Sequence, residues 1–140
     1  MKEYKIRDLT VGMQESFSVI ITSDMMQKFL SITGDENPLH VNGKFAKSKG
    51  FENRVVYGML TASLISTLGG MYLPGKFCLI RGVDVKFVKP VYVGDKLEIT
   101  GEVSRVEAEL KCLEVKVTIK NQRNEKVLRG ILKAGVVDEN

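Results

Sequence analysis

Residues 55–75, VVYGMLTASLISTLGGMYLPG, form a run without a single charged side chain. Within it, residues 58–68 lack proline and carry apolar residues on nearly every side, which predicts a helix buried on all faces. The length of the run also raises a membrane span as an alternative. Polar residues and a glycine pair interrupt it: Thr61, Ser63, Ser66, Thr67 and residues 69–70. Only about three turns of helix remain, so we expect a soluble protein whose other segments wrap a central helix.

Composition favours one globular domain spanning residues 1–140. The chain is 44% hydrophobic and 27% charged, which suits one core and leaves too little sequence for two. The first ten residues lack the apolar segment of a secretory signal, so we expect a cytoplasmic protein. The formal net charge of +4 is spread along the chain. It suits a small anionic ligand at least as well as nucleic acid, and no nucleic-acid-binding motif accompanies it.

The two cysteines, Cys78 and Cys112, lie far apart, each within a strand-like run. Neither belongs to a CxxC motif or has enough potential ligands nearby for a metal cluster. We therefore expect no metal site and interpret both cysteines as reduced, buried thiols.

The region before the uncharged run predicts one strand and two helices. Residues 15–22 alternate as a half-buried strand does. A helix capped by Thr22 or Ser23 is expected to end at Ile32, and a shorter one to cover residues 42–49. The apolar stripe of the first helix is interpreted as core, with a ligand pocket as the alternative: Met25, Met26, Phe29, Leu30 and Ile32.

The segment TGDENPLH, residues 33–40, separates these helices. Gly34 permits a positive φ at the helix end, and Pro38 disfavours the helical conformation at the residue before it. The backbone should therefore turn and then run extended. This stiff loop carries His40, the only histidine, five residues after Asp35.

After residue 75 the pattern changes from helical to alternating, which predicts four strands. Their inward-facing residues are Phe77, Leu79, Val83, Val85 and Phe87; Leu97, Ile99, Gly101 and Val103; Leu113, Val115, Val117 and Ile119; and Leu128, Leu132, Ala134 and Val136. A hairpin turn is expected at residues 121–125. Together with the first strand they predict an α+β fold, a five-stranded antiparallel sheet wrapped around the central helix.

Two segments resemble the (R)-specific enoyl-CoA hydratases and MaoC-like dehydratases. They are FLSITGDENPLHVNGKFAKSKGFENRVVYGML at residues 29–60 and KFVKPVYVGDKLEITGEV at residues 86–103. The resemblance implies the hot-dog fold, a homodimer whose sheets join edge to edge, and acyl-thioester sites at the subunit interface. One position departs from the pattern, because Tyr57 stands where the family usually has a histidine.

Hydration of an enoyl thioester needs groups that move protons and a donor for the charge that develops on the thioester oxygen. Asp35 and His40 are suitable for the proton transfers. The start of the central helix offers free N–H groups, and Gly58 has no Cβ to obstruct a ligand. The resemblance assigns the oxyanion donor to Gly58. It therefore implies a hydro-lyase that interconverts trans-2-enoyl and (R)-3-hydroxyacyl thioesters.

Other readings of these residues stay open. A lone His40 is more often a surface or packing residue, and Asp35 could form an Asx-turn or a cap. Met59, Ser63 and Ser66 are candidate substrate contacts on the central helix, although a helical hydroxyl can also bond back to the backbone.

Charged residues outside the motif also have two interpretations. Asp95 is expected to be structural, in a Gly-Asp turn. Five basic residues could attract the phosphates of coenzyme A or simply form a solvated face: Lys44, Lys47, Lys49, Arg54 and Lys89.

The expected partner is an acyl thioester of coenzyme A or of an acyl carrier protein. No metal or redox cofactor is expected. Coenzyme A is not a cofactor here, since it is part of the substrate. Neither a nucleic-acid partner nor a membrane span is expected. Two alternatives to the hydratase are an acyl-CoA thioesterase and a non-catalytic acyl-thioester-binding protein.

Overall fold

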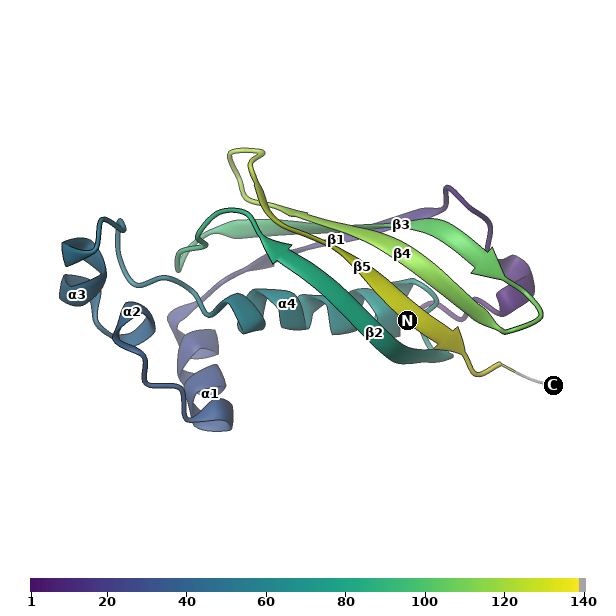
Figure 1. The fold of residues 1–140 in the computed structure, drawn as a ribbon, viewed down its shortest axis with the longest axis horizontal. Helices are drawn as coiled ribbons and strands as arrows, with labels where there is room; N and C mark the ends of the chain where they lie inside the picture. Colours follow the sequence, from purple (N-terminus) through teal and green to yellow (C-terminus); the bar gives the residue numbers. More distant parts are fainter. Residues whose placement is uncertain (139–140) are drawn as a thin grey trace.

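A curved antiparallel sheet packs against one long helix in the computed structural model, which describes residues 1–138 (Figure 1). The strands are β1 (Gln14–Ile20), β2 (Cys78–Phe87), β3 (Lys96–Glu107), β4 (Cys112–Lys120) and β5 (Lys126–Val136). Their order is β1-β3-β4-β5-β2, and every neighbouring pair is antiparallel. The predicted five-stranded sheet is confirmed, and β1 and β2 are its edges.

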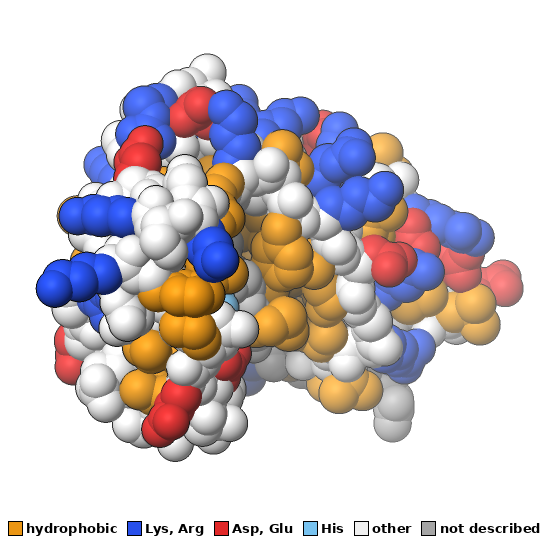
Figure 2. Space-filling view, turned by 60° about the vertical axis from the view of Figure 1, so that its left-hand side comes forward, with side chains coloured by type: hydrophobic (Ala, Val, Ile, Leu, Met, Phe, Trp, Pro, Cys, Tyr) orange, Lys and Arg blue, Asp and Glu red, His pale blue; other side chains and the backbone are white. Residues whose placement is uncertain are grey.

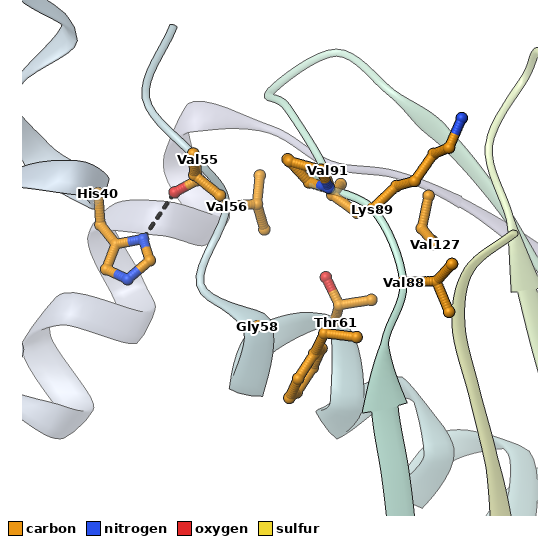
Figure 3. Close-up of a pocket in the computed structure, with 11 residues that line it drawn as sticks. His40, Val55, Val56, Gly58, Thr61, Val88, Lys89, Val91 and Val127 are labelled. Atoms are coloured by element: carbon orange, nitrogen blue, oxygen red, sulfur yellow. Dashed lines mark hydrogen bonds between the residues drawn. The ribbon is translucent and has the colours of Figure 1, made fainter. Parts of the chain in front are cut away.

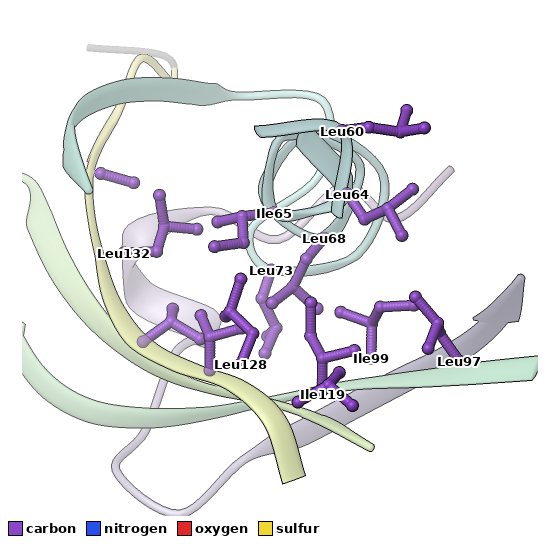
Figure 4. Close-up of a cluster of buried hydrophobic side chains, with 14 of the residues drawn as sticks. Leu60, Leu64, Ile65, Leu68, Leu73, Leu97, Ile99, Ile119, Leu128 and Leu132 are labelled. Atoms are coloured by element: carbon purple, nitrogen blue, oxygen red, sulfur yellow. The ribbon is translucent and has the colours of Figure 1, made fainter. Parts of the chain in front are cut away.

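The helix against the sheet is α4 (Gly58–Thr67), which continues into a π-helical turn, Leu68–Tyr72. Leu64, Ile65 and Leu68 point from it into the core, towards apolar side chains of the strands (Figure 4). The inward-facing residues predicted for β3, β4 and β5 are buried. Gly101 lies in the inward row of β3, where a Cβ would come within 2.9 Å of the Leu68 side chain. The glycine therefore leaves room for the end of the helix.

The prediction that the central helix is buried on all faces is wrong. Met59, Ser63 and Ser66 are exposed, and their i, i+4, i+7 spacing places them on one face of α4. The sheet of a single chain curls around only part of a helix, so this face stays open.

The prediction for β2 also needs a correction, because three of its inward-facing residues, Leu79, Val83 and Phe87, are exposed on this edge strand. The register with β5 shifts between Ile80 and Gly82, so Arg81 is an extra residue in the strand. Such a bulge reverses which side chains face inward on one side of it. Leu79 pairs with Gly135 and is 49% exposed, whereas Ile80 takes the inward register.

Three short helices form a lobe at one end of the sheet (Figure 1). They are α1 (Ser23–Thr33), α2 (Pro38–Val41) and α3 (Gly43–Ser48). The Thr22 side chain caps α1 by accepting from the Met25 N–H at 3.2 Å, and Gly34 ends it with a φ of +69°. Both features agree with the predicted boundaries.

Two details of this lobe differ from the predictions. Ile32 is 81% exposed rather than part of the apolar stripe, because α1 projects away from the sheet and its last turn lies beyond the core (Figure 1). Residues 38–41 form a helical turn rather than an extended segment. Pro38 is its first residue, where a missing N–H costs nothing, and the Asn37 side chain caps it.

Both cysteines are free, as predicted, but they are partly rather than completely buried. Burial still raises the pKa of the Cys78 thiol. Among residues 1–138, no helix is long and apolar enough to cross a membrane.

Candidate active site

A pocket of about 300 Å³ opens between the helical lobe, the start of α4 and the segment that follows β2 (Figure 3). Its lining consists of His40, Val55, Val56, Gly58, Thr61, Phe87, Val88, Lys89, Pro90, Val91 and Val127. Most of these side chains are apolar. The pocket brings together His40 and Gly58, two of the residues that the sequence analysis assigned to one site.

His40 is held in a fixed orientation by the backbone of residue 55. Its Nδ1 lies 2.7 Å from the Val55 carbonyl oxygen, and the Val55 N–H donates to the Leu39 carbonyl at 2.9 Å. A carbonyl oxygen only accepts, so Nδ1 carries the hydrogen of this bond. In the neutral ring Nε2 is then unprotonated and can accept a proton.

Tyr57 connects the two residues expected to handle protons. Its hydroxyl donates to the backbone carbonyl of Asp35 at 2.6 Å. Its ring centroid lies 4.3 Å from that of His40 and 4.8 Å from that of Phe29. The residue is buried, and burial together with the negative charge of Asp35 raises the pKa of its hydroxyl. Tyr57 therefore stays protonated and acts as a hydrogen-bond donor.

Asp35 is exposed. Its carboxylate accepts from the Asn37 N–H at 3.0 Å, the bond of an Asx-turn. The Asp35 N–H donates to the Thr33 hydroxyl at 3.2 Å. The carboxylate is not part of the pocket wall that residues 1–138 form. Asp35 therefore forms the Asx-turn that was one of the two interpretations of this residue.

The helix α4 begins at the pocket, which Gly58 lines. The first N–H groups with a helical partner are those of Leu60 and Thr61, which both donate to the Tyr57 carbonyl, at 3.0 and 3.2 Å. The amides of Gly58 and Met59 precede them and belong to the free N–H groups of a helix N-terminus. These groups and the helix dipole favour a negative charge at this end.

Gly58 also allows an aromatic ring to approach the helix. A Cβ at this position would lie 3.0 Å from Cε1 of Phe87. A larger residue would therefore displace the Phe87 ring, which forms one wall of the pocket. From the sequence alone Phe87 has no recognisable site role, because its place in an alternating run indicates only a strand.

The three other predicted contacts, Met59, Ser63 and Ser66, lie outside the pocket wall as residues 1–138 define it. They share the exposed face of α4. The Ser63 hydroxyl donates to the Leu60 carbonyl at 2.6 Å, which is the backbone bond that the sequence left as an alternative. Thr61 lines the pocket, whereas in the sequence it is only a polar interruption of the uncharged run.

Basic side chains lie above and beside an apolar hollow between the lobe and the sheet (Figure 2). Of the five candidates for phosphate attraction, Lys89 lines the pocket, and its Nζ donates to Glu125 at 2.5 Å. The others lie on or next to α3. Asp95 is structural, as predicted: it is buried and accepts from the Tyr92 N–H at 3.0 Å and the Gln122 amide at 2.9 Å.

Known proteins are similar to this chain in sequence and in fold. A family model described as MaoC-like domain matches residues 9–127, which include both segments that resemble hydratases. The (R)-specific enoyl-CoA hydratase of Aeromonas caviae is 40% identical over 97 residues, 69% of this chain and 71% of that protein. The 3-hydroxybutyryl-CoA dehydratase of Methylorubrum extorquens is 37% identical over 99 residues, 71% of this chain and 63% of that protein. The solved (R)-hydratase of A. caviae involved in PHA biosynthesis gives a TM-score of 0.88 at 31% identity, covering 93% of this chain and 98% of that one.

Proposed function

Because the chain belongs to the family of MaoC-like domains, we propose that it is a hydro-lyase with the hot-dog fold. It adds water to a trans-2-enoyl thioester to give the (R)-3-hydroxyacyl thioester, and catalyses the reverse reaction. The observation that carries this proposal is that His40, in a fixed orientation, and the N-terminus of α4 line the same pocket. These are the two parts that the reaction needs, a base and an oxyanion site.

In the proposed mechanism, Asp35 and His40 form the acid–base pair. Nε2 of His40 is free to take a proton from water, since Nδ1 donates to the Val55 carbonyl. The water oxygen then bonds to the β-carbon, and the α-carbon receives a proton from the pair. Negative charge moves to the thioester oxygen between these events, where the Gly58 amide donates to it. Each acid–base group contributes about 10²- to 10⁴-fold to such a rate.

We further propose that two chains pair as a homodimer through β2. The strand is at an edge of the sheet, and exposed apolar side chains lie along it and just after it: Leu79, Ile80, Val83, Phe87 and Val88. Long, apolar edge strands are rarely left uncovered. The open face of α4, with Met59, Ser63 and Ser66, supports the same pairing, because a second chain there would complete a wall for the acyl group.

The proposed substrate is a thioester of coenzyme A or of an acyl carrier protein. The apolar pocket walls suit the acyl part, and Lys89 at the wall suits a negatively charged carrier group. No metal or redox group enters the proposed mechanism, and the cytoplasm is the expected compartment.

Crotonyl-CoA tests the proposal. A hydratase removes the ultraviolet absorbance of the enoyl thioester without releasing thiol, a thioesterase releases thiol, and a binding protein does neither. His40→Ala and Asp35→Asn should each lower the hydration rate by about 10²- to 10⁴-fold while circular dichroism stays unchanged. Asp24→Asn, at an exposed position of α1, is the control and should keep the full rate. Full activity in both site variants would refute the acid–base assignment.

A further inference from the structure

The hydroxyl of Thr61 is buried in the wall of the pocket and has no hydrogen-bond partner. Thr61 is 2% exposed, and its Oγ1 is the one buried side-chain oxygen or nitrogen without a partner in the part of the chain that the structure describes. A buried hydroxyl without a partner destabilises a folded protein, and such groups are rare. This one therefore indicates a partner that arrives from outside the chain.

The usual partner of a helical threonine hydroxyl does not accept from Thr61. Such hydroxyls commonly donate to the carbonyl four residues earlier, here that of Tyr57. The Tyr57 carbonyl instead accepts the N–H groups of Leu60 and Thr61. Figure 3 shows the Thr61 hydroxyl directed away from α4, towards the side of the pocket where Val56 and Val91 lie. The valine side chains there offer no acceptor.

Thr61 stands close to the proposed oxyanion site. It follows Gly58 by three residues, about one helical turn, so the two share a side of α4. The Cα–Cβ bond of a helical residue tilts towards the N-terminus, which brings the Thr61 side chain back towards the free amides. Both residues line the same pocket.

We propose that the Thr61 hydroxyl is a second donor to the thioester oxygen of the substrate, alongside the Gly58 amide. This proposal rests on the proposed function. When water adds to the β-carbon, the C=C electron pair shifts to the bond between the α- and carbonyl carbons, and the C=O pair moves to oxygen. Two donors then stabilise the enolate oxygen until a proton reaches the α-carbon and the carbonyl re-forms. Thr61 thereby touches the reacting group without being consumed.

The test compares Thr61→Val with Thr61→Ser. Valine keeps the shape of the side chain and removes the hydroxyl, so kcat for crotonyl-CoA should fall by on the order of 10²-fold, the effect of losing one oxyanion donor. Serine keeps a hydroxyl and should retain most of the rate. The unfolding midpoint of Thr61→Val should equal or exceed that of the wild type, because no protein hydrogen bond is lost. Thr118→Val is the matched control, because Thr118 lies in β4 and does not line this pocket. It should change neither kcat nor the unfolding midpoint.

A second measurement does not depend on turnover. Butyryl-CoA has no double bond to hydrate, and the infrared stretch of its ¹³C-labelled carbonyl falls when donors bind the oxygen. Bound to the wild type and to Thr61→Ser, it should show a lower frequency than when bound to Thr61→Val. This shift without hydration of crotonyl-CoA would support the donor role and refute the proposed hydratase activity.

Other outcomes would overturn the proposal. An unchanged kcat and an unchanged carbonyl frequency in Thr61→Val would mean that the hydroxyl binds only a water. A lower unfolding midpoint with unaltered kcat would mean a structural role. If Thr61→Val fails to fold, Thr61→Ala takes its place in the comparison with Thr61→Ser. A carbonyl frequency equal to that of the wild type in both of these variants would exclude the hydroxyl as a donor.

Discussion

Tyr57 contacts both of the residues proposed to transfer protons, Asp35 and His40. A single side chain donates to the backbone of Asp35 and packs its ring against His40. The family that the sequence resembles usually has a histidine here, whose shorter side chain would not span the same two contacts. Tyrosine at this position therefore makes a local arrangement that a histidine could not make in the same way.

Tyr57→Phe should separate the two contacts. Phenylalanine keeps the ring against His40 and removes the bond to the Asp35 carbonyl, so the free energy of unfolding should fall by about 0.5–1.5 kcal/mol. The hydration rate should fall with it, because the segment that carries Asp35 loses an anchor. Urea unfolding and the crotonyl-CoA assay measure both. Tyr72→Phe, whose ring stacks on Phe17 in another part of the core, should leave the hydration rate unchanged; an equal loss there would contradict a specific role for Tyr57.

At individual positions, the sequence predicted motif residues better than wall residues. His40 and Gly58 could be assigned to one site because a short motif and a helix start carry recognisable chemistry. Thr61 could not, since a hydroxyl within an apolar run looks the same whether it bonds to its helix or faces a pocket. Only its missing partner in the folded chain distinguishes the two cases.

Among the structural elements, those with a clear period were predictable. The inward rows of β3 to β5 follow from a 2-residue pattern, and α4 follows from an uncharged run without proline, which did not reveal the exposed face of the helix. The bulge at Arg81 and the single turn of α2 were not predictable, because one extra residue or one turn is too short to change a pattern. Ile32 shows a further limit: its spacing fits the stripe of α1, but the core ends before the helix does.

The turn between β4 and β5 is stabilised by a carboxylate that makes it sensitive to acid. Hydrogen bonds from Lys89, Arg123 and Asn121 lower the pKa of Glu125 from 4.5 to about 2. The lowered pKa stabilises the folded protein at pH values above the ordinary pKa of a carboxyl group. This stabilisation is lost as the pH falls towards 2. Lys89 lies in the pocket wall, so this turn also supports the site.

Glu125→Gln should therefore destabilise the protein at neutral pH and progressively less in acid. The difference in the free energy of unfolding between wild type and variant should be largest above about pH 5 and shrink towards pH 2. Urea denaturation at a series of pH values measures this difference. Glu109→Gln, at an exposed position between β3 and β4, is the control. A difference that stayed constant with pH would show that the charge of Glu125 contributes nothing.

For the whole molecule, two surfaces bear on the proposed pairing of two chains. Within residues 1–138 no strand pairs with the outer edge of β2, which is apolar, and α4 has one exposed face. Both lie on parts of the chain that also form the pocket, since Phe87 ends β2 and Gly58 begins α4. Pairing of two chains would thus cover apolar surface and complete the site in one step, which links assembly to activity.

Val83→Lys tests this link. Val83 is near the middle of β2 and 45% exposed, so a two-fold axis through paired β2 strands would bring the two introduced ammonium groups close together. Charge on an edge strand also opposes strand pairing. Light scattering should show a dimer for the wild type and a monomer for the variant, with the hydration rate falling in parallel and circular dichroism unchanged. Val11→Lys places the same charge on an exposed turn before β1 and should stay dimeric and active. A fully active wild-type monomer, or a dimeric Val83→Lys variant, would show that the site does not need a second chain across β2.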